Sequence, residues 1–383
     1  MKSTRALVLA DDTRLLMPSA SRALITVDAR MIGASGIGTY ISELLPQLIA
    51  ARPELRFALL GPASLLRDQS WTQAPNVRVI ELDAPIYSAR EQIALVRRAP
   101  SDTSLFWSPH YNIPLAWRGR LVVTVHDVVH LALPQFFGGF HRQAYARFMF
   151  RRLSRSADAI MTVSEFTRTE FERLLGVPRA RPEVVHNGVD REWFDLAPSP
   201  RPHPRPYLLY VGNVKPHKNL GRLLEAFGQL ASRTPCDLLL LGKSEGFLTG
   251  DSGVQAAAGR LAPRVQLLGT VSQNLLRQYV AHAEALVLPS LYEGFGLPPL
   301  EAMACGRPTI VSRAASLPEV CGDAAAYFDP LDSTSIAEAI LRVLEDPELQ
   351  ETLRSRGLER ARRFTWERSA QATLAILERV LAT

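Results

Sequence analysis

Two carboxylates eight residues apart, Glu293 and Glu301, lie in the stretch of this chain that is richest in chemical signals. Residues 285–312 read ALVLPSLYEGFGLPPLEAMACGRPTIVS, which predicts a buried strand, a glycine-containing loop and a helix near Leu300–Ala304. The N–H groups at the start of such a helix bind anions, and a glycine loop lets a phosphate approach the backbone. Carboxylates on either side accept hydrogen bonds from hydroxyl groups. The segment therefore indicates a ligand that carries both phosphate and hydroxyl groups.

A lysine provides the cation that such a ligand needs. Lys218 follows the predicted strand Tyr207–Val211 and Gly212, and it precedes a predicted helix that starts at Leu220. A lysine between a strand end and a helix start neutralises a diphosphate and stabilises it as a leaving group. We therefore expect Lys218 on the leaving-group side of the site.

A histidine and a glycine loop come from the other half of the chain. His126 and Asp127 directly follow the predicted strand Leu121–Val125, so the imidazole enters the crevice beyond that strand. Asp127 either orients this histidine or caps a turn. Gly36 and Gly38 precede a predicted helix and offer backbone N–H groups to an anion, although a glycine loop after a strand also fits a dinucleotide.

Short apolar runs alternate with helical periodicity along most of the chain. The remaining predicted strands are Ala23–Val27, Arg56–Leu60, Val77–Ile80, Ala159–Val163, Asp237–Leu241, Val265–Leu268, Ala285–Leu288 and Thr309–Val311. Their continuous apolar runs suit strands that are covered on both faces. Alternation with helices then predicts an α/β architecture with doubly wound parallel sheets.

A proline-rich break divides this series in two. Residues 198–206 read PSPRPHPRP, a stiff and extended segment that fits the interior of neither a sheet nor a helix. We predict Rossmann-like domains over residues 23–197 and 207–365, joined by this linker. Residues 1–22 form an N-terminal extension, and residues 366–383 form a C-terminal helix.

These residues together resemble the signature of glycosyltransferase family 4, which consists of retaining enzymes of the GT-B fold. The resemblance covers the chain from about residue 23 to its end, with the motifs in the family's order. The motifs are Gly33-Ala34-Ser35-Gly36-Ile37-Gly38, Thr124-Val125-His126-Asp127, Thr162-Val163-Ser164-Glu165-Phe166, His186-Asn187-Gly188-Val189-Asp190, Tyr210-Val211-Gly212-Asn213 with Lys218-Asn219, and residues 285–312. The implied fold is two Rossmann-like domains that face a central cleft.

The resemblance also implies a role for each candidate residue. Glu301 binds the ribose hydroxyls of a nucleotide-sugar donor. The catalytic residues are His126, Asp127 and Glu293: Glu293 binds the transferred sugar, and His126 lies near that sugar and the charge that develops on it. The glycine loops and the diphosphate site complete donor binding through Gly36, Gly38, Gly212, Asn213, Lys218, Gly294, Phe295, Gly296 and Leu297. The first domain presents the acceptor, and the last helix packs back on the first domain.

One position departs from the family pattern. Many relatives have an arginine where this chain has Asn213, so the usual two-cation clamp on the diphosphate lacks one member. Lys215, His217 and Arg222 are the candidates to replace it.

No Asp-x-Asp metal-binding motif occurs in the sequence. We expect a metal-independent hexosyltransferase without a cofactor, in which Lys218 and helix N-termini stabilise the leaving group. The sequence of residues 211–219 most resembles that of bacterial mannosyl- and rhamnosyltransferases of surface polysaccharide and lipopolysaccharide assembly. It favours GDP-mannose as the donor over UDP-glucose or dTDP-rhamnose, and a glycan or lipid-linked glycan as the acceptor.

The positive charge of the chain points to an anionic partner. Lys and Arg outnumber Asp and Glu by 44 to 38, and residues 138–157 contain no acidic residue. That segment carries aromatic residues between its arginines, which are Arg142, Arg147, Arg151, Arg152 and Arg155. A basic aromatic helix binds an anionic leaflet, and it equally forms a solvated face above core aromatics. The first alternative suits a membrane-borne acceptor, and we do not expect nucleic acid as a partner.

Cysteine usage and hydropathy indicate the compartment. Cys236, Cys305 and Cys321 form no CxxC pair, and no stretch approaches the roughly 20 apolar residues of a membrane span. We predict a cytoplasmic protein, attached at most peripherally to the inner face of the cytoplasmic membrane.

Three other classes stay open on the residues alone. A nucleotide-sugar epimerase shares the fold and forms product without an acceptor. An NAD-dependent oxidoreductase would use the glycine loop at residues 33–38, and a non-catalytic protein would bind nucleic acid or another anion through its positive charge.

Overall fold

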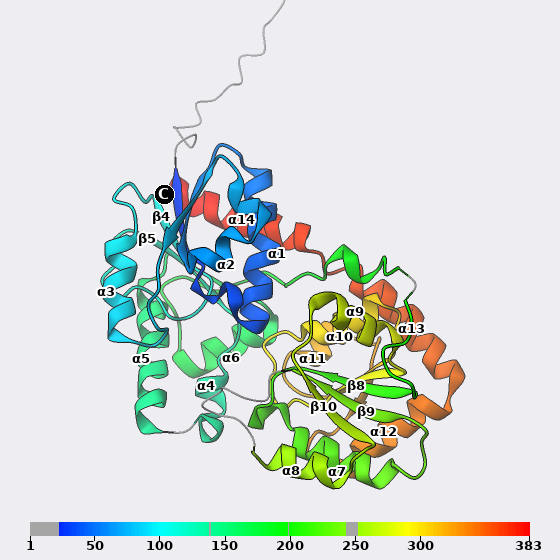
Figure 1. Ribbon diagram of the computed structural model, residues 1–383. Helices are drawn as coiled ribbons and strands as arrows, with labels where there is room; N and C mark the ends of the chain where they lie inside the picture. Colours follow the sequence, from blue (N-terminus) through cyan, green and yellow to red (C-terminus); the bar gives the residue numbers. More distant parts are fainter. Residues whose placement is uncertain (1–22, 138, 198, 243–251) are drawn as a thin grey trace, which may run out of the picture.

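The computed structural model describes residues 23–137, 139–197, 199–242 and 252–383. Two parallel β-sheets, each with helices packed against it, form two domains (Figure 1). The expected N-terminal extension, Pro198 of the linker and Gly138 of the basic segment lie outside the described residues.

The first domain is built on a seven-stranded parallel sheet. In spatial order its strands are β3 (Val77–Glu81), β2 (Arg56–Gly61), β1 (Leu24–Asp28), β4 (Leu105–Ser108), β5 (Arg120–Val125), β6 (Ala159–Thr162) and β7 (Glu183–Val184). The continuous apolar runs of β1, β4 and β6 are fully buried, as expected for strands covered on both faces. Strand order reverses between β1 and β4, so their carboxyl ends border a crevice.

Helices bury both faces of this sheet. They are α1 (Ser35–Ala51), α2 (Ala63–Arg67), α3 (Ala89–Arg98), α4 (Val129–Ala132), α5 (Phe140–Ser156) and α6 (Glu165–Leu175). One core cluster includes Leu44 and Leu48 of α1, and the cluster on the other face includes Phe150 of α5 and Phe171 of α6. The sheet thus holds the start of α1 and the loop after β5 at the same edge.

The second domain repeats the plan with six parallel strands. In spatial order they are β10 (Val265–Gly269), β9 (Asp237–Leu241), β8 (Tyr207–Val211), β11 (Ala285–Leu288), β12 (Thr309–Ser312) and β13 (Ala326–Phe328). The helices of this domain are α7 (Leu220–Leu230), α8 (Ser252–Arg260), α9 (Gln273–His282), α10 (Leu297–Ala304), α11 (Leu317–Cys321), α12 (Ser333–Glu345) and α13 (Pro347–Ala361). Here strand order reverses between β8 and β11.

The last helix, α14 (Trp366–Ala382), returns to the first domain (Figure 1). Its apolar face, which includes Trp366, Leu374 and Leu377, is buried in the same core cluster as α1. A bridge between Val189 and Thr365 pairs the two segments where the chain crosses between domains. The two domains are therefore joined by two chain segments rather than one.

The proline-rich segment lies against the second domain. His203 Nε2 is 2.9 Å from Asp237 Oδ2, and Arg205 pairs with the same carboxylate at 3.2 Å. Arg201 pairs with Glu284 at 3.1 Å. These ion pairs hold a segment whose prolines exclude it from the sheet.

The α/β fold class with two doubly wound parallel sheets is confirmed, and three strands were not predicted. β4 (Leu105–Ser108), β7 and β13 have only two to four residues each. Strand β4 lies at the centre of its sheet, where pairing with β1 and β5 stabilises a run too short to show periodicity.

Candidate active site

An ion pair between Lys218 and Glu293 lies where the second sheet reverses its strand order, beyond β8 and β11. The Lys218 Nζ and Glu293 Oε1 atoms are 2.6 Å apart, and the two side chains are 19% and 13% exposed. The hydroxyl of Ser290 donates a second hydrogen bond to Glu293 Oε1 at 2.7 Å. Ligands of open parallel sheets bind at such a reversal. A cation and a carboxylate therefore lie together at the expected ligand position.

The turn that carries Lys218 is fixed by the next residue. Lys218 ends a 3₁₀ turn, and Asn219 adopts a left-handed conformation with φ 60°, which asparagine tolerates better than most residues. The Asn219 side-chain amide donates to the carbonyls of Pro289 at 3.0 Å and Pro330 at 2.7 Å. Helix α7 starts immediately afterwards, so its first N–H groups lie beside the lysine.

Gly294 is where the first domain touches the loop that carries Glu293. A Cβ atom at Gly294 would lie 1.9 Å from the carbonyl oxygen of His126, so no larger residue fits. The Gly294 carbonyl accepts hydrogen bonds from the hydroxyls of Ser164 at 2.6 Å and Thr167 at 3.1 Å. Both hydroxyls belong to the start of α6, so the first domain positions this loop directly.

The same loop is held from within the second domain. The Ser316 hydroxyl lies 3.0 Å from the Glu293 carbonyl oxygen and 2.8 Å from the Phe295 carbonyl oxygen. Gly296 has φ 104° and caps the N-terminus of α10, which begins at Leu297. This conformation favours glycine. Pro298 and Pro299 follow in the first turn and have no N–H group, so Leu297 provides the free backbone N–H at the start of α10.

Glu301 lies in α10, and its carboxylate has no hydrogen-bond partner among the described residues. Burial raises the pKa of Glu301 to about 7, against the opposing charge of Arg277 and with a further contribution from Glu43. Burial likewise raises the pKa of Glu43 to about 7, with Asp190 adding to the rise and Arg277 opposing it. The charges of Arg277 and of Glu43 on α1 of the first domain therefore both act on Glu301 of α10.

Arg277 is tied to the segment that connects the domains. It lies on α9 and pairs with Asp190 at 3.6 Å and with Glu192 at 2.5 Å. Its guanidinium also lies over the ring of Trp193 at 5.7 Å. These contacts fix the position of the guanidinium whose charge opposes the rise in the pKa of Glu43 and of Glu301.

His126 follows β5 and is held in its neutral form. Its Nε2 atom lies 2.8 Å from the carbonyl oxygen of Pro109, which makes Nε2–H the donor and leaves Nδ1 as an acceptor. Burial lowers the pKa of His126 to about 4, although the bond to Pro109 and the charge of Asp127 oppose that decrease. The edge of the Tyr40 ring packs against the imidazole with centroids 4.7 Å apart.

Asp127 caps a turn in this structure. Its Oδ1 atom accepts the N–H of Val129 at 3.0 Å, at the start of the short helix α4. Its charge opposes the decrease in the pKa of His130 that burial causes. Asp127 thus places a negative charge on the first-domain side of the site.

The two glycines of the first loop have different surroundings. Helix α1 begins at Ser35, so Gly36 and Gly38 lie within its first turn rather than before it. A Cβ atom at Gly38 would lie 2.5 Å from the Ile32 carbonyl oxygen, whereas one at Gly36 would have no heavy atom within 4 Å. Gly38 is therefore required by packing, and Gly36 leaves open space at the helix start.

Asn213 joins the two domains. Its side-chain amide donates to the Ser35 hydroxyl at 2.9 Å, so the end of β8 meets the start of α1. Gly212 beside it has φ 154°, and a Cβ atom at Gly242 would lie 2.0 Å from the Gly212 carbonyl oxygen. Glycines at both strand ends let β8 and β9 approach the Asn213 turn closely.

The three candidates for the second cation differ in environment. The Arg222 guanidinium donates to Asn219 Oδ1 at 3.0 Å. Burial lowers the pKa of His217 to about 2, with Lys218 and Lys215 adding to the decrease, so His217 is neutral. Burial and Lys218 lower the pKa of Lys215, while Asp127 and Glu293 raise it. Lys215 therefore shares the charged environment of Lys218.

Family models for glycosyl transferases match both halves of the chain. The family described as Glycosyltransferase Family 4 matches residues 34–193, and the family described as Glycosyl transferases group 1 matches residues 192–360. O-antigen chain mannosyltransferase B from Escherichia coli is 30% identical over 372 residues, which cover 89% of this chain and 95% of that protein. The chain belongs to glycosyltransferase family 4.

Other relatives and solved structures are similar to this family 4 glycosyltransferase. O-antigen chain mannosyltransferase RfbU from Salmonella typhimurium is 29% identical, over 64% of this chain and 66% of that protein. Sucrose-phosphate synthase from Thermosynechococcus elongatus superposes with a TM-score of 0.76 at 22% identity, over 94% of this chain and all of that chain. HepE from Anabaena in complex with UDP-glucose gives a TM-score of 0.75 at 18% identity, over 93% and 99% of the two chains. The GT-B fold and the hexosyltransferase class are confirmed.

Several residues of this glycosyltransferase site were not predicted from the sequence. They are Ser35, Glu43, Ser164, Thr167, Arg277, Ser290 and Ser316, each of which contacts or electrostatically biases a predicted residue. Ser35, Ser164 and Ser290 belong to motifs of the family resemblance, which are the signal that could have identified them. Glu43 and Arg277 lie on helices with ordinary charged faces and carry no such signal.

Glu319 contributes a further contact between the two domains. Its carboxylate accepts the N–H groups of Glu165 at 2.8 Å and Phe166 at 2.9 Å, and it lies 2.9 Å from His186 Nε2. Burial alone would raise the pKa of Glu319, but the hydrogen bonds from His186 and these two N–H groups hold it below its usual value. Glu319 thus caps α6 beside the hydroxyls that hold Gly294.

The predicted basic segment forms helix α5 in the first domain. All five of its predicted arginines are exposed, as are Phe140 at 80% and Phe148 at 53%. Met149 and Phe150 are buried in the core. Its aromatic residues therefore divide between the core and the surface.

The described part of the chain shows no metal cluster and no membrane-spanning helix. No three His, Cys, Asp or Glu side chains of those residues come together as a ligand set. Within the same residues, no helix combines the length and the hydropathy that crossing a bilayer requires.

Proposed function

We propose that this glycosyltransferase is a retaining enzyme that transfers mannose from GDP-mannose, in α-linkage, to a glycan of a bacterial surface polysaccharide. The proposal rests on the Lys218–Glu293 pair at the reversal of strand order, in a chain similar to an O-antigen chain mannosyltransferase over 95% of that protein. UDP-glucose and dTDP-rhamnose are the alternative donors.

In the proposed donor complex, the ribose hydroxyls donate hydrogen bonds to Glu301. Glu301 is half-buried, and its carboxylate has no hydrogen-bond partner among the described residues, so binding hydroxyl groups would compensate its partial desolvation. The diphosphate would lie at the starts of α7 and α10, beside Lys218. Both helix starts and the lysine favour negative charge at one place.

The proposed transfer step uses the Lys218–Glu293 pair. The diphosphate attracts Lys218, and Glu293 then accepts hydrogen bonds from hydroxyls of the transferred sugar. The bond from sugar C1 to the phosphate oxygen breaks while the acceptor hydroxyl oxygen bonds to C1 on the same face. The acceptor proton passes to the leaving phosphate oxygen. His126 is neutral, so its Nδ1 atom accepts a hydrogen bond from a sugar hydroxyl.

We propose that the leaving group needs no metal ion, because Lys218 and two helix starts already provide positive potential there. EDTA should leave the initial rate of transfer within about twofold of its value in buffer alone. Loss of activity in EDTA that Mg²⁺ or Mn²⁺ restores would contradict this proposal.

A screen of nucleotide-sugars tests the donor. A ligand present at 100 times its dissociation constant adds about 2.7 kcal/mol of apparent stability, so thermal shifts with GDP-, UDP- and dTDP-sugars should single out GDP-mannose. Transfer of labelled mannose to an α-mannan oligosaccharide should then require that oligosaccharide. Isomerised sugar formed without any acceptor would instead indicate the epimerase.

We also propose that the outer face of α5 contacts an anionic membrane, which would suit a lipid-linked acceptor. Its exposed arginines with Phe140 and Phe148 combine positive charge with apolar side chains. The protein should sediment with vesicles containing phosphatidylglycerol and be released by salt. The double variant Arg147→Glu, Arg151→Glu should not sediment, whereas Arg233→Glu on the second domain should behave as wild type.

A further inference from the structure

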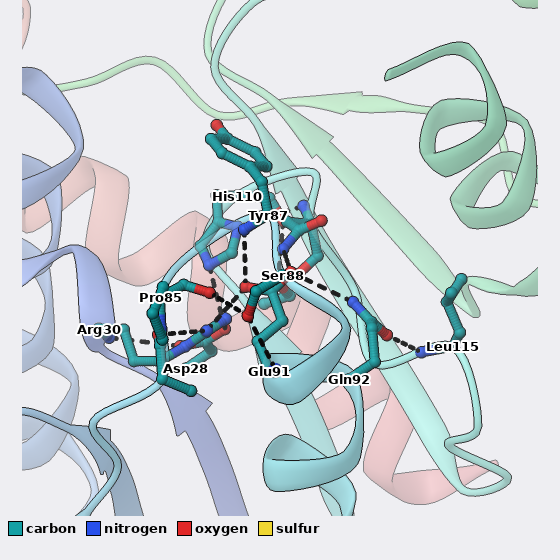
Figure 2. A network of polar contacts seen from close by, with 12 residues as sticks. Asp28, Arg30, Pro85, Tyr87, Ser88, Glu91, Gln92, His110 and Leu115 are labelled. Atoms are coloured by element: carbon teal, nitrogen blue, oxygen red, sulfur yellow. Dashed lines mark hydrogen bonds and ion pairs between the residues drawn. The ribbon is translucent and has the colours of Figure 1, made fainter. Parts of the chain in front are cut away.

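The first sheet also reverses its strand order, and its reversal is occupied by a buried polar network (Figure 2). Asp28 ends β1 and pairs with Arg30 at 2.7 Å and with His110 beyond β4 at 3.1 Å. Arg30 also pairs with Glu91 of α3 at 2.8 Å. The side chains of Asp28 and Glu91 are 0% exposed. Because every charge is paired and buried, this network supports a site rather than binding a ligand itself.

Tyr87 stands above this network in an unusual backbone conformation. It has φ 68°, which is costly for a residue with a large side chain. Its N–H donates to Glu91 Oε2 at 3.1 Å, and Ser88 next to it caps α3 by accepting the Glu91 N–H at 3.2 Å. The network therefore holds a strained turn in place, yet the Tyr87 side chain is 52% exposed and adds little to the core.

A row of rings runs from Tyr87 towards the Lys218–Glu293 pair. The ring centroid of Tyr87 lies 6.0 Å from that of Tyr111, and Tyr111 lies 5.9 Å from His130. The row continues through Phe137, which is 4.2 Å from His130 and 5.5 Å from His217 of the second domain. His217 immediately precedes Lys218 in the sequence. The row thus begins at the surface and ends beside the site.

The exposed ring of Tyr87 and the charges near the first rings of this row indicate the kind of ligand. Burial raises the pKa of Tyr111, and Tyr87 and the Asp127 carboxylate raise it further. Burial also raises the pKa of Tyr87, again with a contribution from Asp127. Both phenols are neutral, and His130 beside them has charges of both signs nearby, the Asp127 carboxylate and the Lys215 ammonium. The exposed Tyr87 ring therefore offers its electron-rich face to the C–H groups of a neutral sugar.

We propose that the exposed ring of Tyr87, backed by Tyr111 and the edge of His130, binds a neutral hexose ring of the acceptor glycan, at a position beyond the sugar that receives the transferred residue. The Tyr111 ring is stacked on Phe150 at 4.5 Å, so Tyr87 is the more exposed of the two rings. The proposal rests on the proposed glycosyl transfer, and it adds the place where a longer acceptor is recognised. Aromatic faces with a few fixed polar groups are the usual lining of small-molecule sites. The buried network below keeps the rings in position before the acceptor arrives, which reduces the cost of binding.

Kinetics with acceptors of increasing length test the subsite. Initial rates with GDP-mannose would be measured against methyl α-mannoside, α-mannobiose and α-mannotriose for wild type, Tyr87→Phe, Tyr87→Gly and Ile93→Ala. Glycine accepts φ 68° without strain, so Tyr87→Gly removes the ring while leaving the turn at least as stable. Ile93 lies on α3 and is 56% exposed, which makes its variant a matched surface control.

Tyr87→Gly should raise the KM for mannotriose about tenfold, with kcat and the KM for GDP-mannose unchanged. Its KM for methyl α-mannoside, which fills only the reacting position, should be unchanged. Tyr87→Phe and Ile93→Ala should match wild type with every acceptor. Equal KM values of Tyr87→Gly and wild type for mannotriose would overturn the subsite, as would an equal increase for all three acceptors.

Donor measurements separate failure of the subsite from failure of the proposed function. Thermal shift and slow hydrolysis of the donor without acceptor report on the donor site, which does not include Tyr87. If another nucleotide-sugar is the donor, the same comparison is made with it. If no donor is turned over, calorimetry with mannotriose decides. Weaker binding to Tyr87→Gly than to wild type supports the subsite, and equal or absent binding to both overturns it.

Discussion

The two sheets each reverse their strand order once, but the charged side chains at the two reversals differ in burial and in hydrogen-bond partners. In the first domain Asp28, Arg30 and Glu91 are buried and fully paired. In the second domain the Lys218–Glu293 pair is partly accessible, and Glu301 is half-buried without a hydrogen-bond partner among the described residues. Satisfied charges make a scaffold, whereas accessible or unsatisfied ones leave interaction energy for a ligand. The same architecture therefore supplies rigidity on one side of the cleft and reactivity on the other.

Replacing Arg30, the cation of the buried network in the first domain, should have the largest effect, and that effect should be on stability. Arg30→Met leaves Asp28 and Glu91 buried without their shared partner, and it should lower the free energy of unfolding by about 3–5 kcal/mol. Urea unfolding measures this change. Arg52→Met is the control, because its pair with Glu378 is about 40% exposed and should contribute less than about 1 kcal/mol. Similar losses for the two variants would remove the distinction between the domains.

Removing the cation from the second reversal should affect the reaction rather than the fold. Lys218→Ala should lower kcat about 10²–10³-fold, as loss of one electrostatic contact to a developing charge does. Unfolding free energy should decrease less than in Arg30→Met, because the side chains are 19% and 13% exposed and Glu293 keeps the hydrogen bond from Ser290. Radiolabelled transfer and urea unfolding together check both parts. Arg233→Ala, an exposed cation of the same domain, should leave both quantities unchanged, and near-wild-type transfer by Lys218→Ala would refute the site.

A methyl group placed where the domains meet tests whether the first domain positions the reactive loop. In Gly294→Ala the new Cβ would lie 1.9 Å from the His126 carbonyl oxygen, so the loop must shift and kcat should decrease about 10²-fold. Gly259→Ala in α8 is the control, since no heavy atom lies within 4 Å of its Cβ. It should leave transfer unchanged. Full activity of Gly294→Ala would mean that the loop does not depend on this contact.

The smallest effect should come from the carboxylate that α1 contributes. Glu43→Gln removes one cause of the raised pKa of Glu301, so that pKa should decrease from about 7. If ionised Glu301 binds the ribose hydroxyls, affinity for GDP-mannose rises with pH through about 7 in wild type and at lower pH in the variant. Above pH 8 the two proteins should bind equally. Calorimetry between pH 5 and 8 measures the shift, and Glu348→Gln on exposed α13 should not change the profile.

The raised pKa values of Glu43 and Glu301 also affect folding stability. Rising pH should decrease this contribution to stability, whereas it should increase donor affinity. The two pKa values are raised in the folded state from an ordinary value of 4.5 to about 7. Between these values the folded protein binds more protons than the unfolded chain, so this contribution to stability decreases as pH rises. Glu43→Gln should flatten that dependence. A steeper decrease in the variant would contradict the assignment of Glu43.

Much of the second-domain site could be read from the sequence because its parts are neighbours along the chain. Glu293, Gly294 and Glu301 occur in one strand–loop–helix segment, and their spacing reflects the geometry of that segment. Lys218 was placed in the same way, by the strand before it and the helix after it. Local periodicity and glycine placement determine such units before any long-range contact forms.

The first-domain contribution could not be read in that way. Ser164 reaches Gly294 across 130 positions of sequence, and Asn213 reaches Ser35 across 178. Neither the strained turn at Tyr87 nor its link to Glu91 follows from any local pattern, since tyrosine does not favour a positive φ. These contacts depend on how the elements pack, and spacing along the chain does not encode packing.

The sequence by itself determined the alternation of strands and helices, the proline break, the family and the carboxylates and lysine of the donor site, because each depends on residues close together in the chain. Only the tertiary structure decided which charges are paired and which are left for a ligand. It brought Glu43 and Glu301 near enough to Arg277 for its charge to affect both pKa values, closed the Gly294 loop against His126 and aligned the rings from Tyr87 to His217. Burial and proximity, which set those electrostatic states, exist only after the two domains have packed together.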